Sequence, residues 1–306
     1  MITRICMVET INMKFLVTGS AGLVGTQVIK DLAYLNHQVY SCYHDTKPEG
    51  GIATKLDLRN QNDIINVIDT IKPDRIIHLA AMTNIDLCEI EKDLAMKINA
   101  DATKALAEQA AKTNAFFLYV STDYVFDGIN GMRKESDTPN PLGFYGKSKL
   151  AGEIALNNMA SPYAIARTST PFGFHKRKKS FPIWVKESLE SKKDIPVLVD
   201  QFTSPTYVPN LSRMLIEIAT RQLVGIFHTA GASRISRYNF AEVISEKLRL
   251  DRKFLRPASM SEMNWKAQRP KDSSLDVSLA NEILDEKPQT IQNGLDCLMD
   301  ELNSIR

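Results

Sequence analysis

The sequence has few cysteines, and they lie far apart. Its 306 residues include only four, and none forms a C-x-x-C pair or another metal-ligand spacing: Cys6, Cys42, Cys88 and Cys297. Structural zinc sites gather cysteine and histidine at short fixed spacings, and disulfide-stabilised secreted domains are short and rich in cysteine. We therefore predict no metal site, and we expect the reduced setting of a cytoplasmic protein.

Long apolar runs and an excess of one charge are also missing. No run approaches the roughly 18 apolar residues that a membrane-spanning helix needs, and the first dozen residues lack the apolar stretch of a signal peptide. Lys+Arg total 38 against Asp+Glu 36, a net charge of +2. We therefore expect neither nucleic acid nor a membrane as partner. Residues 1–12 precede a further methionine, Met13, and are predicted to be an N-terminal extension.

A glycine-rich turn follows the first apolar segment. Residues 14–18 are typical of a buried strand, and a helical pattern covers residues 26–35. Between them, Gly19 permits a tight turn, Gly22 lets a pyrophosphate approach the backbone, and Gly25 lets helix and strand pack closely. The free N–H groups at a helix N-terminus also attract an anion. This order predicts dinucleotide binding by Gly19, Ala21, Gly22, Leu23 and Val24.

Strands and helices alternate through the first half of the chain. The later strands are expected at residues 38–43, 56–58, 75–79, 116–120 and 163–167, and the helices at 61–71, 93–114 and 145–158. This alternation predicts an α/β fold with a Rossmann-type doubly wound parallel sheet.

From Thr168 onward the pattern changes. Helices are expected at residues 181–190, 208–221 and 236–248, with short strands at 195–199 and 225–228. We predict a dinucleotide-binding domain of residues 13–170 and 205–232. Residues 171–204 and 233–306 would form a smaller, partly interleaved substrate-binding domain.

The end of the second strand should meet the adenosine ribose, and it leaves two possibilities. If Tyr43 holds the ribose position, no acid is present, and His44 and Lys47 could favour NADP. If the strand runs two residues longer, Asp45 takes the position and favours NAD because a carboxylate repels a 2′-phosphate. We expect NADPH slightly more than NADH.

Other residues are expected around the same cofactor, because ligands of open α/β sheets bind at the carboxyl ends of the strands. Asp57 is placed to face the adenine, and Ala80 and Ala81 are small enough for a cofactor to lie against the backbone. His78 lies within an apolar strand and is expected to be a core histidine. Leu58, Asn99 and Val120 are also predicted to contact this cofactor.

Tyr145 and Lys149 are spaced to lie on one face of a helix. A phenol has an ordinary pKa of about 10, and a nearby ammonium lowers it toward the range in which proton exchange is useful. Thr122 follows the fifth strand, where its hydroxyl can donate to a substrate carbonyl oxygen that gains negative charge. We predict these three residues as the catalytic set.

The combined motifs resemble those of an extended short-chain dehydrogenase/reductase, and more narrowly of the dTDP-4-dehydrorhamnose reductase family. The narrower resemblance rests on S-T-D-Y-V-F-D-G at 121–128, P-L-x-x-Y-G-K-S-K-L-A-G-E at 141–153, D-Q-x-x-x-P-T at 200–206 and R-P-x-x-S-x-L-D at 269–276. It implies that Tyr145 protonates a 4-keto oxygen while nicotinamide delivers hydride, that Lys149 holds the nicotinamide ribose, and that Thr122 polarises the carbonyl.

The resemblance also implies a nucleotide-sugar substrate, although the chain departs from the family pattern at Thr170 and after Gly173, where the usual asparagine-phenylalanine pair is missing. Thr170 stands where the family usually has a tryptophan that packs on the deoxysugar. The implied substrate contacts are Thr83, Asp123, Tyr124, Thr170, Gln201 and Arg269.

Two other functions fit the same motifs. One is another reductase, dehydrogenase or epimerase of the extended family that acts on a different sugar nucleotide. The other is a regulatory subunit without catalysis, because the regulatory beta subunit of methionine adenosyltransferase shares D-Y-V-F-D-G and Y-G-K-x-K-L-x-G-E. A homodimer is also possible, since the helices expected at residues 93–114 and 145–158 could pair across a two-fold axis.

Overall fold

Seven parallel strands form the central sheet of the structure, a computed structural model that describes residues 12–157, 159 and 161–304. Residues 1–11, and with them Cys6 and most of the predicted extension, lie outside the described residues. Across the sheet the strands run in the order β11 (Gly225–His228), β6 (Tyr163–Thr168), β5 (Phe116–Thr122), β4 (Arg75–His78), β1 (Lys14–Thr18), β2 (Gln38–Tyr43) and β3 (Ile52–Lys55). Since every neighbouring pair is parallel, the doubly wound α/β prediction is confirmed.

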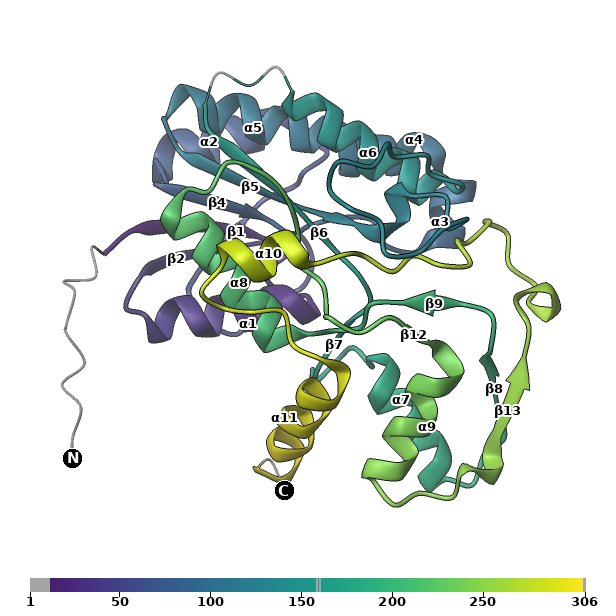
Figure 1. The fold of residues 1–306 in the computed structure, drawn as a ribbon. Helices are drawn as coiled ribbons and strands as arrows, with labels where there is room; N and C mark the ends of the chain where they lie inside the picture. The colour runs from purple at the N-terminus through teal and green to yellow at the C-terminus, as the bar shows by residue number, and fades with distance from the viewer. Residues whose placement is uncertain (1–11, 158, 160, 305–306) are drawn as a thin grey trace.

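Helices cover both faces of this sheet (Figure 1). One face carries α1 (Leu23–Tyr34), α8 (Val208–Arg221) and α10 (Ser278–Ile283). The other carries α2 (Gln61–Ile71), α5 (Ala102–Lys112) and α6 (Phe144–Leu156). Strands between two helical layers are apolar along their whole length, and all of β5 is buried.

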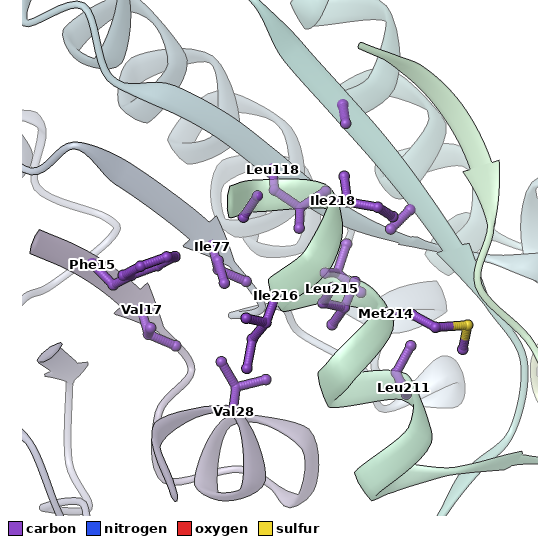
Figure 2. Close-up of a cluster of buried hydrophobic side chains, with 14 of the residues drawn as sticks. Phe15, Val17, Val28, Ile77, Leu118, Leu211, Met214, Leu215, Ile216 and Ile218 are labelled. Atoms are coloured by element: carbon purple, nitrogen blue, oxygen red, sulfur yellow. The ribbon is translucent and has the colours of Figure 1, made fainter. Parts of the chain in front are cut away.

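The apolar stripe of α8 fills the space beneath the sheet (Figure 2). Leu211, Leu215 and Ile218 recur at the spacing of one helix face and are fully buried. They belong to the same buried cluster as Phe15 and Val17, which lie two residues apart in β1 and so share one side of the sheet. This apolar face therefore holds α8 against the strands of the central sheet.

The helix expected over residues 93–114 is interrupted, which corrects that prediction. It consists of α4 (Lys92–Met96), a π-helical turn η1 (Lys97–Asp101) and α5. The turn leaves the buried Asn99 free to bond outside the helix: its Oδ1 accepts from Met82 N at 2.8 Å, and its Nδ2 donates to Ser148 Oγ at 2.9 Å. Periodicity does not reveal such a turn, because the apolar spacing on either side is preserved.

Other element boundaries also differ from expectation, and three of them lie beside the carboxyl edge of the sheet or its glycine turn. Helix α1 begins at Leu23 rather than at residue 26, and β5 continues to Thr122. Strand β3 ends at Lys55, before the segment 56–58, because its partner β2 ends at Tyr43. Asp57 therefore lies in a loop directly beyond the sheet edge.

The second half of the chain packs around a separate apolar cluster that includes Phe172, Val185, Phe240 and Leu295. Its helices are α7 (Phe181–Glu190), α9 (Arg237–Lys247) and α11 (Ile291–Ser304), and its short strand pairs are β7 (Pro171–Phe172) with β10 (Thr206–Tyr207), β8 (Ile195–Leu198) with β13 (Leu255–Ala258), and β9 (Phe202–Thr203) with β12 (Ile235–Ser236). Helix α10 contacts β11 instead and contributes Ala280 to the core of the large sheet. The division into two domains stays a prediction.

The remaining elements are short. Helix α3 (Ile85–Ile90) precedes α4, and three 3₁₀ turns, η2 (Asp123–Val125), η3 (Arg252–Phe254) and η4 (Met260–Glu262), follow β5, α9 and β13. None of the helices in the described part of the chain is long and apolar enough to cross a membrane.

A fully buried ion pair joins α6 to β6. Arg167 donates from Nε to Glu153 Oε1 at 3.0 Å and from Nη2 to Glu153 Oε2 at 2.6 Å, and its guanidinium lies 5.1 Å from the centre of the Phe126 ring. Both side chains are at most 5% exposed. In these buried surroundings the two charges compensate each other through a bidentate pair. Removal of either side chain would leave the charge of the other unpaired in the interior.

We expect Glu153→Ala to destabilise the fold by about 3–5 kcal/mol, because it leaves the Arg167 guanidinium buried without a counter-charge. Urea unfolding of the variant and of Lys104→Ala, an exposed change on α5, would measure the difference. A loss no larger than that of Lys104→Ala would contradict this account of the pair.

Candidate active site

A cleft of about 920 Å³ opens along the carboxyl edge of the sheet. The ends of β1, β2, β4 and β5 line it together with the start of α1 and α6, and parts of the second half of the chain close one side. Most of the predicted site residues line it: Gly19, Ala21, Gly22, Leu23, Val24, Tyr43, His44, Asp57, Leu58, Ala80, Ala81, Thr83, Val120, Thr122, Asp123, Tyr124, Tyr145, Lys149 and Thr170.

The glycine turn brings the backbone of β1 against that of β4. Gly19 has a φ of +68°, which suits glycine, and a Cβ there would lie 2.8 Å from Ala80 N. A Cβ on Gly25 would overlap Gly19 O, so α1 and β1 also meet only through glycine. Gly22 caps α1 without a side-chain acceptor, which leaves the first N–H groups of the helix open to the cleft. These features suit a bound pyrophosphate.

His78 lies behind this turn and not in the cleft. It is fully buried and bonds Thr18 Oγ1 at 2.7 Å and Thr103 Oγ1 at 3.1 Å. Burial lowers the pKa of His78 to about 3, so the ring is neutral. The prediction of a core histidine is confirmed.

The adenosine end of the cleft carries a small charge network. Tyr43, His44 and Asp45 all line it, whereas Lys47 does not. Arg59, which we did not predict, donates to both oxygens of Asp57, at 2.9 Å from Nε and 2.7 Å from Nη2. These bonds hold the pKa of Asp57 well below its usual range. Arg59 Nη2 also lies 2.8 Å from His44 Nε2, and His44 Nδ1 lies 2.8 Å from Asp45.

The predicted catalytic residues converge where α6 meets the end of β5. A Cβ on Gly146 would overlap Tyr124 O, so the first turn of α6 lies directly on the η2 backbone and places the Tyr145 ring 5.9 Å from that of Tyr124. Lys149 is buried, donates from Nζ to Val120 O at 2.8 Å, and lies 4.1 Å over the ring of Tyr119.

The expected effect of Lys149 on the Tyr145 pKa is wrong for this structure. Burial raises the pKa of Tyr145 above that of a free phenol, and only a hydrogen bond with Thr122 opposes the rise. Lys149 is not among the groups that shift this pKa; its Nζ donates to Val120 O and lies over the Tyr119 ring. Tyr145 is therefore a protonated phenol, the form that can donate a proton.

Thr122 is tied to a buried carboxylate. Its hydroxyl donates to Asp123 Oδ1 at 3.0 Å and accepts from Tyr124 N at 3.2 Å. Asp123 Oδ2 accepts from Ser169 Oγ at 2.7 Å, and burial raises the pKa of Asp123. The donor predicted for a substrate carbonyl is thus engaged within the protein and must turn in order to serve one.

Three predicted site residues lie outside the lining of the cleft. Asn99 braces the loop at Met82, and Gln201 is buried beside the hydroxyl of Tyr124. Arg269 makes a bidentate pair with Asp86, with both bonds at 3.0 Å, and its guanidinium lies 4.1 Å over the ring of Trp265.

Arg237 and Lys178 line the cleft although neither was predicted as a site residue. Lys178 belongs to a basic run whose His175 lies 3.4 Å from Thr26, in the first turn of α1. Arg237 is the first residue of α9 and reaches the cleft from the second half of the chain. No local motif marks it, because its contacts come from distant segments.

No group of three or more potential ligands among histidine, cysteine, aspartate and glutamate is arranged to hold a metal ion, within the residues that the structure describes. Cys42, Cys88 and Cys297 are free thiols.

Comparison with known proteins gives several full-length relatives. A dTDP-4-dehydrorhamnose reductase of Aggregatibacter actinomycetemcomitans is 34% identical over 79% of this chain and 86% of its own length. Methionine adenosyltransferase 2 subunit beta of Bos taurus is 31% identical over 87% of this chain and 81% of its own. The crystal structure of dTDP-4-dehydrorhamnose reductase from Bacillus anthracis in complex with NADP superposes with a TM-score of 0.86, at 29% identity, over 95% of this chain and 100% of that one.

The family described as the RmlD substrate binding domain matches residues 13–304, so that the match covers both the sheet with its glycine turn and the second half of the chain. The protein therefore belongs to the RmlD family.

Proposed function

We propose that the protein is an NAD(P)H-dependent reductase of a nucleotide-linked 4-keto-6-deoxysugar, of the type that converts dTDP-4-dehydrorhamnose into dTDP-rhamnose. The observation that carries the proposal is the meeting of Thr122, Tyr145 and Lys149 at the end of a cleft that begins at the glycine turn. The RmlD relatives that are named as this reductase support it.

The cleft suits a nicotinamide dinucleotide. The glycine turn leaves no room for a side chain between β1 and β4, and the open N–H groups of α1 face the same space, as a pyrophosphate requires. The cofactor supplies a hydride when bound. The NADP in the Bacillus anthracis structure supports NADPH, in agreement with our slight preference, and NADH remains the alternative because Asp45 also lines the cleft.

Tyr145 is the proton donor in this proposal. When a 4-keto carbon accepts hydride, its oxygen gains negative charge and takes the phenolic proton of Tyr145, which leaves a phenolate. Burial keeps the phenol protonated until then. Thr122 supplies a second donor to the same oxygen once its hydroxyl turns away from Asp123.

Lys149 stabilises the phenolate that this step leaves on Tyr145. The Nζ lies one helical turn from Tyr145 and has donors beyond the one that Val120 O accepts. An ammonium next to a new phenolate favours it, and a ribose hydroxyl of the dinucleotide is a second acceptor that the ammonium could reach.

Two alternatives have specific support. The substitution at Thr170 favours a different sugar, and hence another reductase or epimerase acting on a sugar nucleotide. The 31% identity to methionine adenosyltransferase 2 subunit beta favours a regulatory subunit that binds the cofactor without turnover. Co-purification with a methionine adenosyltransferase catalytic subunit would favour the second.

We expect NADPH oxidation when dTDP-4-dehydro-L-rhamnose is generated in situ, followed by the absorbance of the nicotinamide. Tyr145→Phe should reduce the rate about 100-fold or more because it removes the acid. Tyr34→Phe is the matched control, since Tyr34 is 87% exposed and lies at the far end of α1. Running NADH in parallel measures the cofactor preference. Cofactor binding without oxidation by the wild type would contradict the proposal.

The buried Lys149 should make stability depend on pH. Burial lowers its pKa to about 7, whereas an unfolded lysine keeps its ordinary pKa of about 10.4. Between these values the unfolded chain holds a proton that the folded chain lacks, so this group makes stability rise with pH, by at most about 1.4 kcal/mol per pH unit.

Urea unfolding of wild type and Lys149→Met at pH 7, 8 and 9 would measure this effect as the difference between the two proteins. The wild type should gain stability relative to the variant as the pH rises. A constant difference over this range would show that Lys149 keeps its charge in the folded state.

A further inference from the structure

Arg237 presents a cation to the cleft without a carboxylate partner. Among the described residues, no aspartate or glutamate oxygen lies within the 4.0 Å of an ion pair with it, whereas Arg59 and Arg269 each hold a carboxylate. Its side chain has one hydrogen bond, from Nη2 to Thr170 Oγ1 at 3.3 Å, and the guanidinium lies 5.3 Å from the centre of the Phe181 ring. Several of its five donors are therefore available to a ligand.

A chain of hydroxyl groups fixes the guanidinium in place. Thr170 Oγ1 lies 2.6 Å from Thr203 Oγ1, which lies 3.1 Å from Ser169 Oγ, and Ser169 donates to Asp123. Because Arg237 can only donate and a carboxylate only accepts, each hydroxyl is oriented to accept on one side and donate on the other. These hydroxyl groups thus connect the Arg237 guanidinium to the buried Asp123 carboxylate, while the two charged groups make no direct contact.

Thr170 adopts an unusual conformation to take part in this chain. Its φ is +42°, in the left-handed region that a β-branched residue rarely occupies. Strain of this kind persists only where surrounding contacts impose it, and it is concentrated at functional sites. Here the Thr170 side chain lines the cleft and supports Arg237.

Arg237 and Thr170 lie in the same cleft as the predicted catalytic residues. Thr170, Arg237 and Tyr124 line the same cleft, and the Tyr124 ring lies 5.9 Å from that of Tyr145. A sugar that contacts Tyr145 would thus share the cleft with the Arg237 guanidinium. Partly buried guanidinium groups bind phosphate and carboxylate oxygens through paired, charge-assisted bonds.

We propose that Arg237, held by Thr170, is an anion-binding subsite that takes a phosphate or carboxylate group of the substrate. This inference rests on the proposed function for its location and concerns the part of the substrate beyond the reacting carbonyl. A nucleotide sugar offers two sources of such a group. One is the diphosphate that links base and sugar, and the other, for a sugar acid in place of the 6-deoxysugar, is a carboxylate on the sugar itself.

Calorimetric titration of the full chain saturated with NADP⁺ would test the subsite with dTDP, dTDP-glucose and dTDP-glucuronate. Arg237→Gln should weaken binding about 10- to 100-fold for every probe whose anion contacts the guanidinium. A similar loss for all three identifies the diphosphate as the source, and a loss confined to dTDP-glucuronate identifies the sugar carboxylate. Arg237→Lys should recover part of the affinity because it restores the charge but not the paired donors.

Two further variants separate this effect from a general loss of structure. Arg252→Gln removes an exposed arginine elsewhere in the same half of the chain and should bind all three probes as the wild type does. Thr170→Gly removes the supporting hydroxyl at a backbone conformation that glycine accepts, and should weaken binding several-fold. NADP⁺ affinity, which does not depend on this subsite, should be unchanged in each variant.

Changes of less than two-fold in Arg237→Gln for all three probes, or a wild type that binds none of them, would overturn the subsite. The proposed reductase activity fails separately: in that case binding of at least one of the three probes still depends on Arg237, but the keto-sugar produces no NADPH oxidation.

Discussion

The site depends on how closely α6 approaches the sheet. Two glycines make this possible: a Cβ on Gly146 would overlap Tyr124 O, and one on Gly152 would lie 2.5 Å from the Tyr119 hydroxyl and 2.6 Å from Asn99 O. With the helix backbone this near, Lys149 reaches Val120 O, and Tyr145 enters the cleft. Helix α6 is thus positioned by backbone contact, which is less adjustable than side-chain packing.

The face of α6 that meets the sheet carries a series of functional groups one turn apart. Tyr145, Lys149 and Glu153 succeed each other at intervals of four residues, and Glu153 anchors the series through its buried pair with Arg167 of β6. Tyr145 and Lys149 line the cleft, whereas the ion pair does not and is buried. The helix therefore carries both the proposed proton donor and the ion pair that anchors the helix, so displacement of Glu153 would also shift Tyr145.

Local sequence patterns are sufficient to predict the glycine turn and the pairing of Tyr145 with Lys149. The spacing of three or four residues in each case is set by a single turn or a single helix. Local patterns are insufficient where a residue is defined by distant segments. Arg269 pairs with Asp86, 183 residues away, and so lies outside the lining of the cleft in which we expected it. Arg237 bonds Thr170, 67 residues away, and lines the cleft unpredicted. The π-helical turn at Asn99 likewise comes with contacts to Met82 and Ser148, which periodicity does not contain.

The electrostatics of the cleft suit a proton donor that works beside an anionic substrate. Burial without a ligand keeps Tyr145 protonated and lowers the pKa of Lys149 to about 7, so both groups favour their neutral forms. Transfer of the phenolic proton would create a phenolate, and a phenolate in turn favours the charged form of Lys149. Arg237 lines the same cleft, and no carboxylate of the described residues forms an ion pair with it. Its charge is therefore available to bind the substrate. In the proposed mechanism, the charge that responds to the reaction, on Lys149, is thus separate from the charge proposed to hold the substrate, on Arg237.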